Sequence, residues 1–227
     1  MAIDPLSDAK VLDSWHRNAA PWTVAVRDEQ IESRRLVTDA AIVEAVTSLA
    51  PHTVIDLGCG EGWLVRALVA RGIAALGVDA VPELVDRARE AGGGRFAVAT
   101  YEDIAAGGLE DKADVVVANF ALIGKEAVDG LVGSVHTLLA PGGTFIVQTL
   151  HPVSANGEAP YRDGWRPGSW SGFSTAFSDP APWYFRTLGT WVALFDASHL
   201  QLRAMREPLH PATHRPASVI FFCTESG

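Results

Sequence analysis

Short apolar, β-rich runs alternate with helical patterns through the middle of this 227-residue chain. The runs occupy residues 54–57, 73–78, 95–99, 114–119 and 143–149. Between them, apolar residues recur at helical spacings, most clearly from Val128 to Leu139, and this periodicity predicts helices with one buried face. Short strand–helix–strand connections take right-handed crossovers. The pattern therefore predicts an α/β fold in which a mostly parallel sheet carries helices on both faces.

Two further regions flank this predicted core. Residues 8–49 have a helical pattern and are expected to form an N-terminal helical cap. Residues 186–199 predict one more helix, followed by apolar runs at 200–206 and 218–224. The connection between those two runs is too short for a helical crossover, so we expect them to pair antiparallel.

A glycine-rich turn follows the first predicted strand, in the segment Val54-Ile55-Asp56-Leu57-Gly58-Cys59-Gly60-Glu61-Gly62-Trp63. Glycine permits positive φ angles and lets a ligand approach the backbone closely. The second strand ends at Asp79, 17 residues after Gly62, where a carboxylate can accept hydrogen bonds from both hydroxyls of a ribose. This arrangement predicts a ligand that contains adenosine.

The spacing of the glycines separates two classes of such ligand. A dinucleotide-binding fingerprint places its third glycine three residues after the second, but here that position is Trp63 and the third glycine is Gly62. Asp56 gives a second criterion, because a carboxylate is unfavourable beside a pyrophosphate and favourable beside an ammonium group. The order Asp-x-Gly-x-Gly-x-Gly therefore favours S-adenosylmethionine over a dinucleotide.

Several segments in register are similar to those of class I S-adenosylmethionine-dependent methyltransferases, and the resemblance covers about residues 30–150. They are residues 54–62 (the glycine motif), Asp79 (the ribose-binding acid), 101–104 (the adenine-contacting loop), 114–120 (the fourth strand and its exit) and 139–145 (the turn before the fifth strand). The length of the chain predicts one domain over residues 1–227. The resemblance implies a Rossmann-like, seven-stranded, mostly parallel sheet whose last strand is antiparallel. It also implies that the connection 207–217 lies at the cofactor end of the sheet.

The resemblance further implies which residues contact the cofactor. Trp22 and Arg34 are similar in placement to residues of glycine N-methyltransferase, where an aromatic side chain and an arginine touch the methionine end. The implied cofactor-binding set is Trp22, Arg34, Asp56, Gly58, Cys59, Gly60, Gly62, Asp79, Ala80, Glu102, Asp103, Ile104, Asn119 and Phe120. A solvated helix face is the alternative for Arg34, and a helix cap is the alternative for Glu102 or Asp103. Cys59 is expected to be a small side chain beside the cofactor rather than a nucleophile.

His151 directly follows the fifth predicted strand, at the edge where an acceptor should meet the methyl group. Because histidine titrates near neutral pH, His151 is the candidate catalytic acid–base or acceptor-orienting residue. The alternative is a histidine that only fixes the loop to the end of the strand.

Residues 152–183, called the insert below, hold six of the chain's 19 aromatic residues among many glycines and prolines. This composition predicts a lid over an apolar or aromatic acceptor, although a satellite core or a partner surface fits it as well. The segment Trp183–Thr187 is expected to open the next helix; it resembles the Tyr-His-Arg-Thr-Leu stretch of bacterial small-molecule methyltransferases, with Phe185 replacing the histidine. The candidate acceptor contacts are His151, Trp165, Trp170, Tyr184 and Arg186.

Composition and charge exclude several other classes. The net charge of −9 and the segment Asn119-Phe120-Ala121-Leu122, which departs from the Asn-Pro-Pro-aromatic motif of nucleic-acid amino-methyltransferases, argue against nucleic acid as a partner. No apolar stretch is long enough to span a bilayer, the start lacks the pattern of a signal peptide, and the two cysteines predict a reducing, cytoplasmic compartment. His210 and His214 are separated by Pro211, so no metal site is expected.

The sequence thus predicts an S-adenosylmethionine-dependent methyltransferase that acts on an O, N or C nucleophile of a small molecule. A non-catalytic S-adenosylmethionine-binding protein and, less favoured, an NAD-dependent oxidoreductase are the alternatives. The sequence predicts neither the acceptor nor the oligomeric state.

Overall fold

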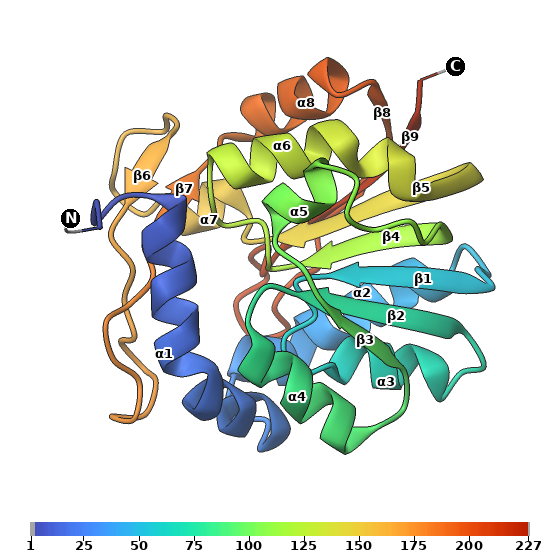
Figure 1. Ribbon diagram of the computed structural model, residues 1–227. Helices are drawn as coiled ribbons and strands as arrows, with labels where there is room; N and C mark the ends of the chain where they lie inside the picture. The colour runs from blue at the N-terminus through green and yellow to red at the C-terminus, as the bar shows by residue number, and fades with distance from the viewer. Residues whose placement is uncertain (1–2, 227) are drawn as a thin grey trace.

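The computed structural model describes residues 3–226 and contains a seven-stranded sheet with the order β3-β2-β1-β4-β5-β9-β8 (Figure 1). The strands are β1 (Thr53–Leu57), β2 (Ala74–Asp79), β3 (Arg95–Val98), β4 (Ala113–Asn119), β5 (Leu139–Thr149), β8 (Leu200–Arg206) and β9 (Val219–Glu225). β9 pairs antiparallel with both β5 and β8, and the other pairings are parallel. The predicted Rossmann-like sheet with an antiparallel last strand is confirmed.

Helices cover both faces of this sheet. The helical elements of the fold are α1 (Asp8–Arg27), the π-helical turn η1 (Arg34–Thr38), α2 (Asp39–Thr47), α3 (Trp63–Val69), α4 (Pro82–Ala91), α5 (Tyr101–Ala105), α6 (Glu126–Ser134), the 3₁₀ turn η2 (Val135–Leu138), α7 (Pro152–Ala155) and α8 (Leu188–Ala197). One apolar core joins the sheet to α6 and α8, and a second joins it to α2 and α3 on the opposite face. Strands buried on both faces explain the continuous apolar runs in the sequence.

The end of α6 and the start of β5 differ from the sequence-based expectation. The apolar pattern from Val128 to Leu139 is not one helix, because α6 ends at Ser134, η2 follows, and β5 already begins at Leu139. Val135, Leu138 and Leu139 are all buried in the same apolar core. The helical spacing of apolar residues therefore extends past the end of α6, because η2 and the start of β5 bury residues in the same core.

The insert contains short regular elements that its composition did not reveal. It begins with α7 and includes β6 (Gly164–Arg166), which pairs antiparallel with β7 (Trp183–Phe185). The expectation that Trp183 opens the next helix is wrong, because Trp183–Phe185 is a strand and Thr187 caps the N-terminus of α8 with its side chain. The β7 strand exists because a distant segment pairs with it, and residue propensity carries no signal for such a partner.

The carboxyl ends of the parallel strands meet at one edge of the sheet, where α1 and the orange insert lie (Figure 1). The strand order reverses between β1 and β4, and ligands of open α/β sheets bind outside the carboxyl ends of the strands at such a point. The β1–α3 turn lies at this point, so we expect a ligand to bind between this turn and the segments that cover it.

Candidate cofactor and acceptor site

The glycine turn after β1 passes very close to the exit of β4. Gly58 has φ +75°, and a Cβ atom there would stand 2.3 Å from the Cβ of Ala121. Gly60 has φ +57°, and its backbone N–H donates to Oδ2 of Asp79 at 2.8 Å. Both positions therefore require glycine, one for a close backbone approach and the other for the turn that reaches Asp79.

Asp79, at the end of β2, is held by the backbone on both sides. Its Oδ2 accepts from Gly60, and its Oδ1 accepts from the N–H of Val81 at 2.9 Å; Ala80 lies between Asp79 and Val81. Burial raises the pKa of Asp79, and the backbone hydrogen bonds oppose that rise. Each carboxylate oxygen keeps a further lone pair, so the carboxylate can still accept from two hydroxyls.

Asp56 and Arg34 bring unlike charges to the end of β1. Asp56 is 2% exposed, and its Oδ1 has no hydrogen-bond partner among residues 3–226. Burial raises the pKa of Asp56 to about 7; the charge of Asp79 adds to the rise and that of Arg34 opposes it. A buried carboxylate with a free oxygen is suited to receive a cationic group.

Arg34 projects from η1 and is held by stacking. Its Nε donates to Oδ1 of Asp39 at 2.9 Å, and the guanidinium lies 4.8 Å from the ring centre of Trp63 and 5.8 Å from that of Trp22. Its Nη2 is buried without a partner in the described chain. The solvated-face alternative for Arg34 therefore does not describe this side chain, which is mostly buried and retains an unused donor.

The two acidic residues after β3 differ in their contacts. Asp103 forms a capping box with Thr100 at the start of α5, and these hydrogen bonds lower the pKa of Asp103. Glu102 is exposed, and Ile104 is a buried core residue. Of the two acids predicted to contact adenine, Asp103 is thus already engaged in capping, which leaves Glu102 as the available one.

Hydrogen bonds of Gln148 link the ends of β4 and β5 to η1. The buried Gln148 donates from Nε2 to the carbonyl of Thr38 at 3.0 Å and to Oδ1 of Asn119 at 2.9 Å. Phe120 has φ +54° and donates its N–H to the carbonyl of Gln148. The Thr38 carbonyl accepts from the Gln148 amide, which fixes the orientation of that amide and leaves its Oε1 buried without a partner among the described residues.

His151 lies two residues after β5 and is 4% exposed. Its Nε2 is 2.8 Å from Oε1 of Glu207, a residue that follows β8. Ser154 also donates to the carbonyl of Pro216 at 3.0 Å. These contacts place the connection between β8 and β9 beside the end of β5, at the expected edge of the sheet.

The other predicted acceptor contacts lie in or next to the insert. Trp165 and Tyr184 pack edge to face across β6 and β7, with 5.6 Å between ring centres. Arg186 is buried and donates to the carbonyls of Gly124 and Lys125 and to Oδ1 of Asp129 at 2.7 Å. The donors of Arg186 thus join the segment between β7 and α8 to the start of α6.

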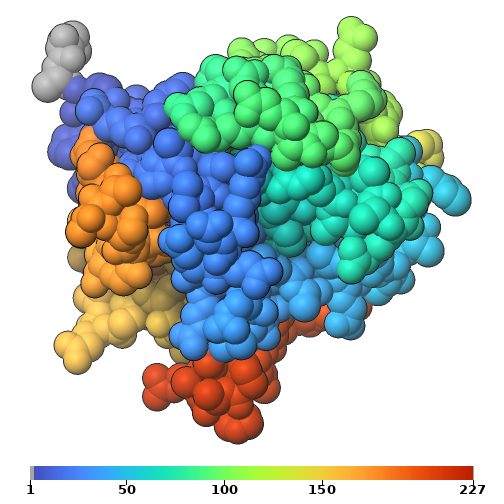
Figure 2. All heavy atoms as spheres, turned by 90° about the horizontal axis from the view of Figure 1, so that it is seen from below, coloured from blue at the N-terminus to red at the C-terminus, as the bar shows by residue number. Residues whose placement is uncertain are grey.

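The insert and α1 form one wall over the carboxyl edge. Asn18 is fully buried; its Nδ2 donates to the carbonyl of Ser178 at 2.7 Å, and its Oδ1 accepts from the N–H of Ser178 at 3.0 Å. Trp170 packs edge to face on Trp15, which packs in the same way on Trp22. In the space-filling view the orange insert lies directly against the blue N-terminal segment (Figure 2). A chain of aromatic rings therefore runs from the insert to the glycine turn.

A family model described as a methyltransferase domain matches residues 29–206. The chain belongs to the class I S-adenosylmethionine-dependent methyltransferases. The ubiquinone biosynthesis O-methyltransferase of Methylococcus capsulatus is 34% identical over 113 residues, 48% of this chain and 48% of that protein. The trans-aconitate 2-methyltransferase of Methylobacterium nodulans is also 34% identical over 113 residues, 48% of this chain and 42% of that protein. The matched part is thus about half of each of these two relatives, or less.

A solved structure with the same fold covers the whole chain. It is the 1,6-didemethyltoxoflavin-N1-methyltransferase of Burkholderia thailandensis with bound 1,6-didemethyltoxoflavin and S-adenosylhomocysteine. The TM-score is 0.66 at 19% identity, and the match covers 100% of this chain and 92% of the other. The likeness shows the fold of the methyltransferase.

Sequence reasoning missed several residues of this methyltransferase that border the site. Glu61, within the glycine turn, is buried and paired with Arg27 at the end of α1 and with Arg66 of α3. Tyr101 donates to the carbonyl of Ala121 at 3.3 Å, and burial raises its pKa. Arg27 is 34 residues from Glu61, so no local spacing reports that ion pair. Tyr101 could have been found, because it stands in the segment predicted to contact adenine.

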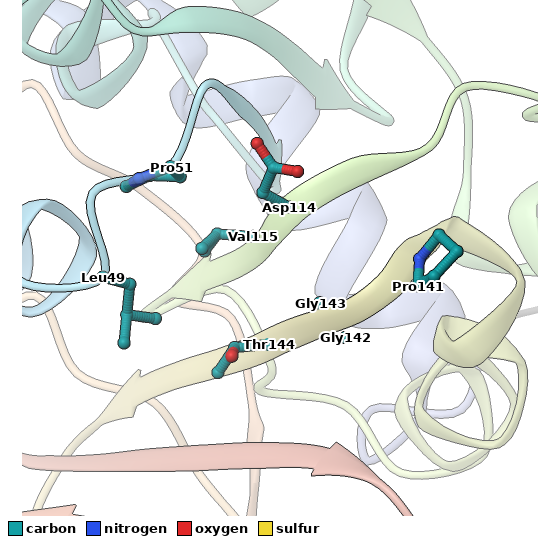
Figure 3. A pocket seen from close by; sticks show the side chains of 8 residues that line it. All are labelled: Leu49, Pro51, Asp114, Val115, Pro141, Gly142, Gly143 and Thr144. Atoms are coloured by element: carbon teal, nitrogen blue, oxygen red, sulfur yellow. The ribbon is translucent and has the colours of Figure 1, made fainter.

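The methyltransferase also has hollows away from the glycine turn. A cavity of about 230 Å³ lies at the amino ends of β4 and β5, lined by Leu49, Pro51, Asp114, Val115 and residues 141–144 (Figure 3). It is at the edge of the sheet opposite the glycine turn. A second hollow, of about 560 Å³, is lined by insert residues that include Trp165 and Trp183.

Two features are absent from residues 3–226. No group of three or more His, Cys, Asp or Glu side chains is arranged to hold a metal ion. Within the same range, no helix has the length and apolar character to cross a membrane. Cys59 and Cys223 are both buried free thiols, and burial raises the pKa of each.

Proposed function

We propose that this protein transfers the methyl group of S-adenosylmethionine to an O, N or C nucleophile of a small molecule. The observation that carries the proposal is the pair of unused, oppositely charged groups at the glycine turn: Nη2 of Arg34 and Oδ1 of Asp56. A buried polar atom without a partner is costly. The amino-acid end of the cofactor has the complementary charges, a carboxylate for Arg34 and an ammonium group for Asp56.

Other residues at the same edge of the sheet would contact the ribose, the adenine and the carboxylate of the cofactor. Asp79 would accept from the ribose hydroxyls with the lone pairs that the backbone leaves free. Glu102 would accept from the adenine amine, because Asp103 is engaged in capping. Trp22 and Trp63, which flank Arg34, would fix the guanidinium for a bidentate pair with the cofactor carboxylate.

When bound, the sulfonium cofactor supplies an electrophilic methyl group. The chain's own residues hold the two ligands in line and exclude water, and such positioning accounts for much of the rate of a bimolecular transfer. His151 would take the proton of the acceptor. The wall formed by α1 and the insert would cover the acceptor, with Trp165, Trp170 and Tyr184 as its aromatic surface.

A small acceptor is supported by three observations. The net charge is −9, which disfavours a polyanionic substrate. The exit of β4 reads Asn119-Phe120-Ala121-Leu122, which lacks the motif of nucleic-acid amino-methyltransferases. The curated relatives named above modify small molecules by their names.

The test of the cofactor site is calorimetric titration of S-adenosylmethionine into Asp79→Ala and Gly60→Val. Loss of the charged acceptor at Asp79 should cost about 1.5–3 kcal/mol, which weakens binding about ten- to a hundred-fold. Valine at Gly60 must adopt φ +57°, with its Cβ 3.5 Å from Nε1 of Trp22, so binding should be abolished. Asp86→Ala, which removes an exposed carboxylate from α4, is the matched control. Wild-type affinity in both site variants would refute the assignment.

Turnover separates an enzyme from a non-catalytic binder of the same cofactor. Incubation with phenol and amine libraries and with metabolite pools should yield S-adenosylhomocysteine together with a product heavier by one methylene group. Tight cofactor binding without any such product would favour the non-catalytic alternative. Binding of NADH in place of S-adenosylmethionine would favour an oxidoreductase.

A further inference from the structure

His151 is held by a carboxylate that comes from a distant part of the chain. Glu207 contacts its Nε2 at 2.8 Å, while the Nδ1 of the same ring is buried and has no partner in the described chain. His151 is 4% exposed and the Glu207 side chain is 45% exposed. The pair thus joins a buried ring at the end of β5 to a carboxylate that reaches solvent.

Hydrogen bonds hold both ends of the β8–β9 connection beside His151 and α7. Glu207 begins that connection, and the carbonyl of Pro216 near its other end accepts from Ser154 of α7. Pro152, the first residue of α7, follows His151 directly. The ring is therefore fixed by its own helix and by the connection that carries its carboxylate partner.

The partner determines which ring nitrogen carries the hydrogen. A neutral imidazole has one N–H, and a carboxylate can only accept. The hydrogen must then be on Nε2 to bond Glu207, so the lone pair is on Nδ1. The buried nitrogen without a partner is consequently the basic one.

We propose that Glu207 is a positioning residue that holds His151 in the Nε2–H tautomer, so that Nδ1 serves as the general base toward the acceptor. The inference rests on the proposed function and extends it by naming the basic atom and the group that orients it. In the transfer step Nδ1 takes the proton of the acceptor X–H. The X–H electron pair forms the X–CH₃ bond, and the pair of the breaking S–CH₃ bond stays on sulfur, which becomes a neutral thioether. The imidazolium so formed is stabilised by the Glu207 carboxylate and returns its proton to water.

The first test is a spectroscopic measurement that needs neither ligand. In ¹⁵N-histidine-labelled protein at about pH 8.5, where a free imidazole is neutral, His151 should show a protonated Nε2 and an unprotonated Nδ1. The ring signals are assigned by their loss in His151→Ala. The hydrogen bond to a carboxylate should shift the Nε2–H proton resonance downfield and slow the exchange of this proton with water. This proton signal should be lost in Glu207→Ala, persist in Glu207→Asp, and persist in the control Glu44→Gln, which removes an exposed carboxylate of α2.

The second test uses turnover with an acceptor found in the screen. His151→Ala should lower turnover about 10²–10⁴-fold, and Glu207→Ala should lower it at least about tenfold, with partial recovery in Glu207→Asp and with cofactor affinity unchanged in all three. A proton on Nδ1 of the wild-type ring, or spectra that are the same in wild type and Glu207→Ala, would overturn the dyad while cofactor binding and turnover stood. Absence of cofactor binding in the wild type would instead overturn the proposed function itself.

Discussion

Asp56→Asn should make the ligand-free protein more stable at alkaline pH and at the same time weaken its hold on the cofactor. The carboxyl of Asp56 is buried with one oxygen unpaired, and burial raises its pKa from 3.8 to about 7. A group whose pKa is higher in the folded than in the unfolded state binds protons more tightly when folded. Its stabilising contribution is therefore complete below the unfolded pKa and is lost as the pH rises toward the folded pKa.

The size of the effect follows from the two pKa values. At about 1.4 kcal/mol per pKa unit, ionisation of Asp56 costs the folded protein about 4 kcal/mol at pH 8, and about 2–3 kcal/mol of this cost arises between pH 5 and pH 8. Asparagine is neutral throughout this range, so Asp56→Asn avoids the cost. The stability difference between variant and wild type should widen by about 2–3 kcal/mol from pH 5 to pH 8.

Urea denaturation of both proteins at several pH values measures this difference. Asp114→Asn is the control of opposite sign, because backbone hydrogen bonds from Thr53 and His52 lower the pKa of Asp114. That substitution removes a carboxylate which stabilises the fold above the unfolded pKa, so it should destabilise the protein at neutral pH. A constant gap between wild type and Asp56→Asn across the pH range would refute the buried-charge reasoning.

The same residue links stability to binding. An ammonium group beside Asp56 favours the carboxylate, so wild-type affinity for S-adenosylmethionine should rise between pH 5 and pH 7, by up to about tenfold per pH unit. Asp56→Asn should bind about ten- to a hundred-fold more weakly and show little of this pH dependence. Equal affinity and an equal pH profile in the two proteins would contradict the placement of the ammonium group.

Two further predictions concern the insert. Asn18→Ala removes both hydrogen bonds to Ser178, so limited proteolysis within residues 152–183 should accelerate several-fold. In the wild type, cleavage should slow only when cofactor and acceptor are both present. Cleavage rates that do not depend on the ligands would favour a packed structural insert over a lid. Arg186→Met should cost about 1–3 kcal/mol of stability and leave cofactor affinity unchanged in calorimetry, whereas a large loss of acceptor affinity at unchanged stability would restore the substrate role that the sequence suggested.

The sheet and the glycine turn could be predicted because local patterns determine them. Apolar runs and helical periodicity gave the parallel strands, and the short 207–217 connection gave the antiparallel pair at the end. The Gly58 and Gly60 positions were identified by spacing, and their positive φ angles bear out the need for glycine. In each case the physical cause lies within a few residues of the signal.

The rest depended on contacts between distant segments. Glu61 looks like an exposed acid in a turn, yet Arg27 and Arg66 enclose it. Arg186 looks like a ligand contact, yet Asp129 of α6 takes its charge. Glu207 gave no signal by itself, although the 207–217 connection was expected at the cofactor end of the sheet. Such pairs are invisible to periodicity because the sequence separation carries no information about the partner.

The contacts of α1 show which part of the wall over the site can move. At its start, both carboxylate oxygens of Asp8 accept backbone N–H groups at the beginning of α6, from Lys125 and Ala127. At its end, Arg27 is paired with the buried Glu61, so α1 is attached to the sheet layer at both ends. The insert around Ser178, by contrast, is hydrogen-bonded to α1 itself through Asn18. Opening of this insert segment requires the loss of its contacts with one helix, whereas displacement of α1 would leave the buried Glu61 without Arg27 and would uncap α6. We therefore expect the acceptor to enter by displacement of the insert while α1 stays in place.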